Sequence, residues 1–355
     1  MLIINQLSIG ISRKLNSFKR LSKFSLAQMS SSSYDYDILV SGGGVVGACL
    51  CAKLLKDPKT AGLKIGLVEL KKPKILEDIS KSPTPEVQVY ALSPSSINFL
   101  KKVDAWDAIE PRSQPYRYMQ VWEANGPGYL RFSSDDIHVN ELGRICENNT
   151  IVASLYDSIL QSNRQIDIMY GSSITDLTVE NNSTYHHSGL AKVEIKDASS
   201  GEKRMVTSRL VVGADGANSY VRKASGITSW GWDYGQKAIV ATVKLKCSGN
   251  GNGNGNGNGN AYQNATAWQK YLPSGPLALL PLWDGYSSIV WSAKTPEATR
   301  LMQLSDELFL EELNNALSSP SNTSKWSVFS PNDVSGSSHF QILNRMKYEG
   351  AAVIS

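Results

Sequence analysis

Three glycines near the start of the sequence have the G-x-G-x-x-G spacing of a cradle for nucleotide phosphates. These are Gly42, Gly44 and Gly47. Residues 36–41 before them are typical of a buried parallel strand, and a helical pattern begins directly after them. Glycine at the first position permits a tight turn, and glycine at the second lets the backbone approach a pyrophosphate. Glycine at the third lets the helix pack against the strand, with its free N–H groups facing the anion.

An acidic residue ends the next expected strand, residues 64–69. Glu69 lies about twenty residues beyond the glycines, where a carboxylate can accept the 2′- and 3′-hydroxyls of an adenosine ribose. The same carboxylate would repel a 2′-phosphate, which argues against NADP. The alternative is a glycine turn of an α/β domain that binds no ligand.

A second segment, much later in the chain, has a strand that runs into a glycine-rich turn. Residues 209–212 form the strand, and Gly213, Asp215 and Gly216 belong to the turn. Such a turn offers a carboxylate and a bare backbone where a cofactor can pass, and the residues after it can cap a short helix. The alternative is an ordinary strand-turn-helix connection in which Asp215 is a turn residue.

From about residue 35 to its end, the sequence resembles the flavoprotein aromatic hydroxylases of the para-hydroxybenzoate hydroxylase type. It is most similar to their mitochondrial ubiquinone-biosynthesis branch. The matching segments occur in the family's order and are residues 90–96, 142–148, 213–222, 231–241 and 266–282. Gln88 departs from the family pattern, which usually has an arginine there. The family's third motif, a Gly-Asp-Ala-Ala-His-type turn, would follow a strand that starts near Tyr348, so we expect the C-terminal closing segment to be missing.

The resemblance implies an FAD-dependent monooxygenase that hydroxylates the ring of a polyprenylated phenol with O₂, through a flavin C4a-hydroperoxide. The residues that it assigns to FAD are Gly42, Gly44, Gly47, Glu69, Gly213, Asp215 and Gly216. Because such a substrate is mostly apolar tail, an apolar channel is expected. Candidates for lining it are Trp230, Trp232, Tyr234, Trp268 and Tyr271, although aromatic residues in strands are more often plain core. No catalytic acid or base and no metal ligand is identified.

The resemblance also implies partners and a location. The electron donor would be ferredoxin with its NADPH-dependent reductase, and other ubiquinone-biosynthesis proteins would join the chain in a complex. The expected site is the matrix side of the mitochondrial inner membrane, with peripheral contact. Residues 1–33 are basic, serine-rich and free of acidic residues, which is the composition of a mitochondrial transit peptide. The alternative is a tail without a targeting role.

Composition excludes other classes of protein. The chain has 355 residues, 41% of them hydrophobic, and no apolar run of the length that a membrane-spanning helix requires. Residues 1–34 contain five basic residues and no acidic one, so the net charge of +4 becomes −1 for the remainder, which argues against nucleic acid as a partner. The four cysteines form no C-x-x-C pair, which argues against disulfides and zinc.

The order of expected elements predicts an α/β protein. A Rossmann-like FAD-binding domain, opened by a βαβ unit, is interleaved with a mostly antiparallel β-sheet substrate domain. We expect the FAD-binding domain at residues 34–110 and 140–228, the substrate domain at 111–139 and 229–345, a Gly-Asn loop at 249–260, and a return to the first domain at 346–355. Further expected helices are residues 93–103, 149–160 and 304–317. Further expected strands are residues 174–179, 191–196, 204–212, 238–246, 265–272, 277–282 and 287–292.

Three alternative functions stay open at this level. One is a flavin hydroxylase of a small soluble aromatic acid, which would need a basic clamp for the carboxylate. Another is a catalytically incompetent, truncated subunit of the ubiquinone-synthesis complex, which the absence of the third motif favours. A hydride-transfer dehydrogenase that uses NAD is disfavoured by the turn around Asp215.

Overall fold

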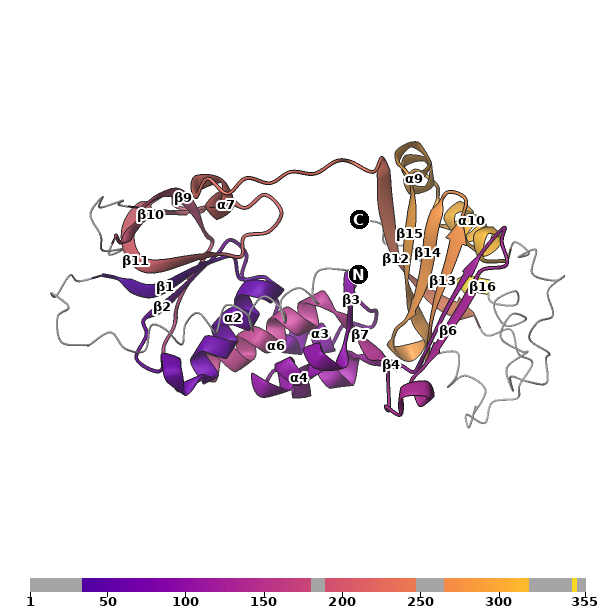
Figure 1. Cartoon of the computed structure of the whole chain (residues 1–355), viewed down its shortest axis with the longest axis horizontal. Coiled ribbons are helices and arrows are strands. Elements are labelled where there is room, and N and C mark those ends of the chain that lie inside the picture. The colour runs from indigo at the N-terminus through magenta and orange to yellow at the C-terminus, as the bar shows by residue number, and fades with distance from the viewer. Residues whose placement is uncertain (1–33, 180–188, 247–264, 319–346, 350–355) are drawn as a thin grey trace. The chain divides into compact units, whose positions relative to one another are not determined.

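The computed structural model describes residues 34–179, 189–246, 265–318 and 347–349, which belong to two compact units (Figure 1). The nucleotide unit comprises the chain up to Lys74 together with Ser96–Trp106 and Val152–Trp230. The sheet unit comprises Ile75–Ser95, Asp107–Ile151 and the chain from Gly231 onward. Residues 75–95, 107–110 and 140–151, expected in the FAD-binding domain, therefore lie in the sheet unit. The predicted segments 1–33 and 249–260 lie outside the described residues.

The nucleotide unit is built on a six-stranded sheet with β1 near its centre. The strand order is β8-β2-β1-β11-β10-β9. The strands are β1 (Tyr36–Ser41), β2 (Ile65–Glu69), β8 (Asp167–Tyr170), β9 (Ser172–Val179), β10 (Ala191–Asp197) and β11 (Lys203–Gly213). β1 pairs in parallel with β2 and β11, whereas β9, β10 and β11 pair antiparallel. The parallel part is the βαβ arrangement that the sequence predicts.

Helices of the nucleotide unit follow the two glycine-rich turns. α2 (Val45–Lys56) comes after β1 and buries Ala48, Cys51 and Leu55. α7 (Tyr220–Ala224) comes after the turn that ends β11. Arg164 donates to the carbonyl oxygens of Leu54 at 2.8 Å and of Asp57 at 3.1 Å, so a guanidinium satisfies carbonyls at the C-terminal end of α2.

The structure contains further helices of three to thirteen residues. They are η1 (Pro58–Thr60), α3 (Leu76–Ser80), α4 (Pro94–Lys102), α5 (Trp106–Ile109), η2 (Glu110–Arg112), η3 (Asp135–Ile137), α6 (Asn148–Leu160), η4 (Trp283–Gly285), α9 (Thr295–Met302) and α10 (Asp306–Ser318). In the part of the chain that the structure describes, we find no helix with the length and apolarity needed to cross a membrane.

The sheet unit contains a seven-stranded sheet in the order β16-β12-β15-β14-β13-β5-β6. Its strands are β5 (Tyr118–Glu123), β6 (Tyr129–Ser133), β12 (Gln236–Lys246), β13 (Thr266–Leu272), β14 (Gly275–Pro281), β15 (Tyr286–Lys294) and β16 (Lys347–Glu349). All pairs are antiparallel except β13 with β5. A second sheet, β3-β7-β4, joins β3 (Val89–Leu92), β7 (Gly143–Glu147) and β4 (Gln114–Tyr116). These pairings connect residues 89–92, 114–116 and 143–147 within the sheet unit.

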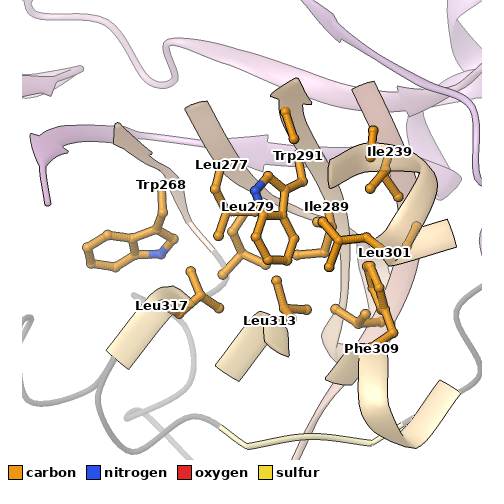
Figure 2. Packing of buried hydrophobic residues seen from close by; sticks show 14 of the residues in the cluster. Ile239, Trp268, Leu277, Leu279, Ile289, Trp291, Leu301, Phe309, Leu313 and Leu317 are labelled. Atoms are coloured by element: carbon orange, nitrogen blue, oxygen red, sulfur yellow. The ribbon is translucent and has the colours of Figure 1, made fainter. Parts of the chain in front are cut away.

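One face of the large sheet is covered by α9 and α10 (Figure 2). Phe309, Leu313 and Leu317 recur every four residues along α10, so they form one apolar face. They pack on strand side chains that include Ile239, Trp268, Leu277, Leu279, Ile289 and Trp291. Each such side chain contributes about 1.5–3 kcal/mol on burial, so this cluster stabilises the sheet unit.

Most predicted elements are confirmed by the structure. The predicted helices 93–103, 149–160 and 304–317 correspond to α4, α6 and α10, and each predicted strand has its counterpart within two residues or so. The mixed α/β fold class is likewise confirmed. The short helices α3 and α9 and the small β3-β7-β4 sheet are not in the prediction.

Candidate functional site

The first glycine turn has the geometry of a phosphate cradle. Gly42 has φ +96°, a left-handed conformation that favours glycine, and its N–H donates to the carbonyl of Val68 at 2.8 Å. Gly44 is the N-cap of α2, and no side chain caps that end. A Cβ built on Gly44 would meet no atom within 4 Å. Open space therefore lies beside the start of α2, the end of a helix where the first backbone N–H groups have no partner within the helix.

Gly47 is needed for close packing. A Cβ built there would lie 1.8 Å from the carbonyl oxygen of Gly42 and 3.4 Å from Cβ of Ala214. No side chain fits in that space, so α2 can sit this close to the turn only with glycine at this position. The structure thus accounts for glycine at Gly42 and Gly47, whereas the role of Gly44 in the approach to a pyrophosphate stays a prediction.

The second turn lies directly against the first. Ser41 and Gly213 are partners in the parallel register of β1 and β11, and the Ala214 N–H donates to the Ser41 carbonyl at 2.7 Å. A Cβ on Gly42 would approach the Ala214 carbonyl oxygen to 2.4 Å. Gly216 has φ +82°, so the turn also uses glycine for a left-handed conformation. Two motifs that are far apart in the sequence therefore form one structure.

Asp215 holds the start of α7. Its carboxylate accepts hydrogen bonds from the Tyr220 N–H at 2.7 Å, the Val221 N–H at 3.2 Å and the Ser219 hydroxyl. Burial alone would raise the pKa of Asp215, but the bonds from Ser219 and Val221 outweigh it, and the pKa is lowered. Ser219 is the N-cap and accepts from the Arg222 N–H at 3.0 Å. Asp215 therefore has the structural role of a turn residue between a strand and a helix, which was the alternative to a role in cofactor binding.

Glu69 ends β2 beside the cradle. Its carboxylate accepts hydrogen bonds from the Gly43 N–H and, at 2.8 Å, from the Lys71 N–H. The side chain is half-buried, so it remains accessible on one side. A carboxylate has more acceptor positions than these two bonds use, so ribose hydroxyls can still be accepted.

The sequence reasoning missed Tyr156, which lies under the cradle. It is on α6 and 3% exposed, and its hydroxyl oxygen is 1.9 Å from the position of a Cβ built on Gly43. Its ring packs against that of Tyr170, with centroids 6.0 Å apart. The available signal was a lone tyrosine on the apolar face formed by Ile151, Leu155 and Ile159, which by itself indicates only core.

The aromatic residues suggested for the substrate fall into two kinds of environment. Trp268 is 4% exposed and packs edge-to-face on Trp122 in the core of the sheet unit, with centroids 6.1 Å apart. Trp232 and Tyr234 are 64% and 77% exposed, and their rings contact each other at 5.9 Å. Tyr271 is half-exposed, and Trp230 is exposed. The structure therefore places Trp268 in the core and leaves the others accessible.

The cysteine thiols of α2 are not suited to act as nucleophiles. Burial raises the pKa of Cys49 and of Cys51 to about 12. Thiols with such a pKa stay protonated near neutral pH and are poor nucleophiles. Packing is sufficient to explain them.

Fold and site define an α/β dinucleotide-binding protein of the flavoprotein class. Residues 35–330 match the FAD binding domain family, and the chain belongs to this family. FAD is thus the cofactor that the paired turns are expected to fit. The open space at Gly44, the uncapped start of α2 and the acidic end of β2 agree with a bound pyrophosphate and ribose.

Several relatives are mitochondrial ubiquinone biosynthesis monooxygenases named COQ6. The Danio rerio protein is 34% identical over 292 residues, which is 82% of this chain and 56% of the relative. The Homo sapiens protein is 34% identical over 288 residues, covering 79% and 56%. The Dictyostelium discoideum protein is 31% identical over 323 residues, covering 89% and 64%. The chain thus spans less than two thirds of the length of these relatives.

Solved structures with the same fold include bacterial monooxygenases. Pseudomonas aeruginosa PqsL in complex with 2-aminobenzoylacetate has a TM-score of 0.57 at 18% identity, covering 79% of this chain and 67% of that one. The p-nitrophenol 4-monooxygenase PnpA from Pseudomonas putida DLL-E4 has a TM-score of 0.55 at 14% identity, covering 90% and 68%. At these identities the likeness establishes the fold.

Proposed function

We propose that this chain binds FAD and supplies the nucleotide and sheet units of a monooxygenase of ubiquinone biosynthesis. The observation that supports the proposal is the contact of the Gly42 turn with the Ala214 turn, which brings the two glycine-rich segments together in one unit. The similarity to the COQ6 ubiquinone biosynthesis monooxygenases supports a monooxygenase of this kind. The reaction that we propose is hydroxylation of the aromatic ring of a polyprenylated phenol with O₂.

The residues of the nucleotide unit have distinct tasks in this proposal. Backbone N–H groups at Gly44 and the first turn of α2 bind the pyrophosphate, and the helix dipole favours its charge. Glu69 accepts the ribose hydroxyls. Bound FAD supplies the activation of O₂ and the transfer of one oxygen atom to the ring. The protein orients the reactants and keeps water away.

The turn of Gly213, Asp215 and Gly216 has a supporting task. Its carboxylate is already engaged with the amides of α7, so Asp215 fixes the backbone of the turn. We infer that the bare glycine backbone is the surface along which the cofactor passes, because a side chain at either glycine would narrow it.

The apolar tail of the substrate calls for accessible aromatic surface. Trp232, Tyr234 and Tyr271 are exposed and remain candidates for it, whereas Trp268 belongs to the core that holds the sheet together. The proposed location is the matrix side of the mitochondrial inner membrane, in peripheral contact with it. The proposed partners are ferredoxin with its reductase and other ubiquinone-biosynthesis proteins.

The cofactor proposal is tested by titrating the purified full-length chain with FAD and recording the visible flavin spectrum and fluorescence. We expect saturable binding near one FAD per chain, and unchanged free-flavin spectra at high protein concentration would overturn the assignment. A second titration separates the substrate classes. A short-chain polyprenylated phenol should perturb the spectrum of the bound flavin, and a perturbation by 4-hydroxybenzoate alone would favour the hydroxylase of a soluble acid instead.

A further inference from the structure

Tyr156 has a buried hydroxyl that packing alone does not explain. The residue is 3% exposed, and its hydroxyl oxygen has no hydrogen-bond partner among the described residues. Leaving such a group unsatisfied is unfavourable, and phenylalanine would fill the same space without that cost. The Tyr156 hydroxyl is therefore a candidate to form a hydrogen bond that appears only when a ligand binds.

The surroundings of this hydroxyl identify that partner. A Cβ built on Gly43 would be 1.9 Å from the Tyr156 hydroxyl and 3.1 Å from both Cβ and Cγ of Glu69. One point beside Gly43 is thus close to both side chains. In the free chain, the Glu69 carboxylate accepts from the Gly43 N–H and from Lys71. Glu69 is therefore the acidic group beside the Tyr156 hydroxyl.

The electrostatics favour a donor role for the tyrosine. Burial raises the pKa of Tyr156, and the negative charge of Glu69 raises it further. The phenol therefore remains protonated at physiological pH and can donate to a carboxylate. A hydrogen bond from a neutral donor to a charged acceptor is stronger than one between neutral groups.

We propose that Tyr156 is a positioning residue for the adenosine half of the cofactor, acting through Glu69. When a ribose diol engages the Glu69 carboxylate, the carboxylate turns and accepts a hydrogen bond from the Tyr156 hydroxyl, which fixes its orientation. The tyrosine does not touch the ligand. This inference rests on the proposed FAD site and adds to it a residue that neither glycine motif contains.

The test compares Tyr156→Phe with Tyr170→Phe as a matched control, because the two rings pack together and both variants lose one hydroxyl. Affinities of the full-length chain for FAD, ADP and FMN are measured by calorimetry, and unfolding of the free chain is measured by heating. We expect Tyr156→Phe to weaken FAD and ADP binding about tenfold or more, which corresponds to about 1.4 kcal/mol. FMN binding and the melting temperature of the free chain should not fall, and Tyr170→Phe should change ADP affinity less than twofold.

A second comparison separates this role from a structural one. In a Glu69→Gln background, adding Tyr156→Phe should weaken ADP binding further by much less than in the native background, because the charged acceptor is gone. Equal ADP affinities of native chain and Tyr156→Phe would overturn the inference while leaving the FAD site intact. An equal loss for ADP and FMN, accompanied by a lower melting temperature, would also overturn it. A native chain that binds neither FAD nor ADP would refute both the inference and the proposed function.

Discussion

The carbonyl oxygen of Ala214 lies 2.4 Å from the position that a Cβ on Gly42 would occupy. This contact joins the glycine cradle after β1 to the turn after β11, and no side chain can be placed between them. The Gly42 backbone is left-handed as well, so two independent constraints require glycine there. The relative position of the two glycine-rich turns is thus fixed by backbone contacts.

The second and third glycines of the cradle should respond differently to the same substitution. Gly44→Val places its side chain in open space, so the fold should lose only about 1 kcal/mol from the poorer N-cap, while FAD binding is abolished. Gly47→Val drives a side chain into the Gly42 carbonyl and should prevent normal folding. Circular dichroism melts and flavin titration of both variants check this, and normal flavin content in Gly44→Val would contradict the cradle assignment.

Asp215 should make the free energy of unfolding of the chain depend on pH in the acidic range. Its pKa is lowered in the folded state, so its stabilising contribution is present above the unfolded value of about 3.9 and disappears as the pH falls through the folded value. Asp215→Asn should therefore lose less stability than the native chain as the pH falls from neutral through the lowered folded-state pKa of Asp215. Urea unfolding at a series of pH values measures the difference. Ser219→Ala removes both the N-cap hydroxyl and the hydrogen bond that it donates to Asp215, so it should cost about 1 kcal/mol and weaken the dependence on acid without abolishing it.

Two leucines of α10 offer a matched test of the sheet-unit core. Leu313 is fully buried against the sheet, whereas Leu308 on the same helix is 51% exposed. Leu313→Ala should lower the free energy of unfolding by about 2–5 kcal/mol, and Leu308→Ala should change it by about 0.5 kcal/mol or less. Denaturant melts give both values. Similar losses in the two variants would mean that α10 does not pack as described.

Residues 1–34 should direct a passenger to mitochondria. A fluorescent protein fused behind this segment is expected to enter the organelle, because the segment is basic and contains no acidic residue. Imaging against a mitochondrial dye measures it. The control replaces Arg13, Lys14 and Arg20 with glutamine, which should leave the fusion diffuse in the cytosol. Diffuse signal from the native segment would remove the targeting assignment.

Local patterns were enough to predict the strands and the long helices. β1 and β2 show as short apolar runs stopped by glycine or by an acid, and α10 shows an apolar residue every fourth position. The short α9 begins with Thr295-Pro296 and has too few turns to display a period. The β3-β7-β4 sheet escaped prediction because its pairings link segments far apart in the chain, and no local pattern encodes them.

The candidate site also has a part that the local sequence predicts and a part that depends on tertiary contacts. The spacing of Gly42, Gly44 and Gly47 predicts the turn between β1 and α2 that the structure contains, because such a turn is a local feature of the chain. The contact of Gly42 with Ala214 depends on the pairing of β1 with β11, which no local pattern encodes. Tyr156 could not be found from the sequence, because it is far along the chain from Gly43 and Glu69 and its hydroxyl comes near them only in the folded structure. Assignment of individual residues to FAD or substrate remains a prediction.

The pairing of β1 with β11 sets a constraint on synthesis of the chain. Asp35 and Thr207, which hydrogen bond beside this pair, are 172 residues apart. At a translation rate of about 5–20 residues per second, β11 is synthesised roughly ten to thirty seconds after β1. One edge of β1 therefore has no partner strand during this time. During that interval the β1-β2 pair presents an open apolar strand edge, which invites association with other chains. A nascent chain of this protein is therefore expected to depend on chaperones that shield the edge until residue 213 has been made.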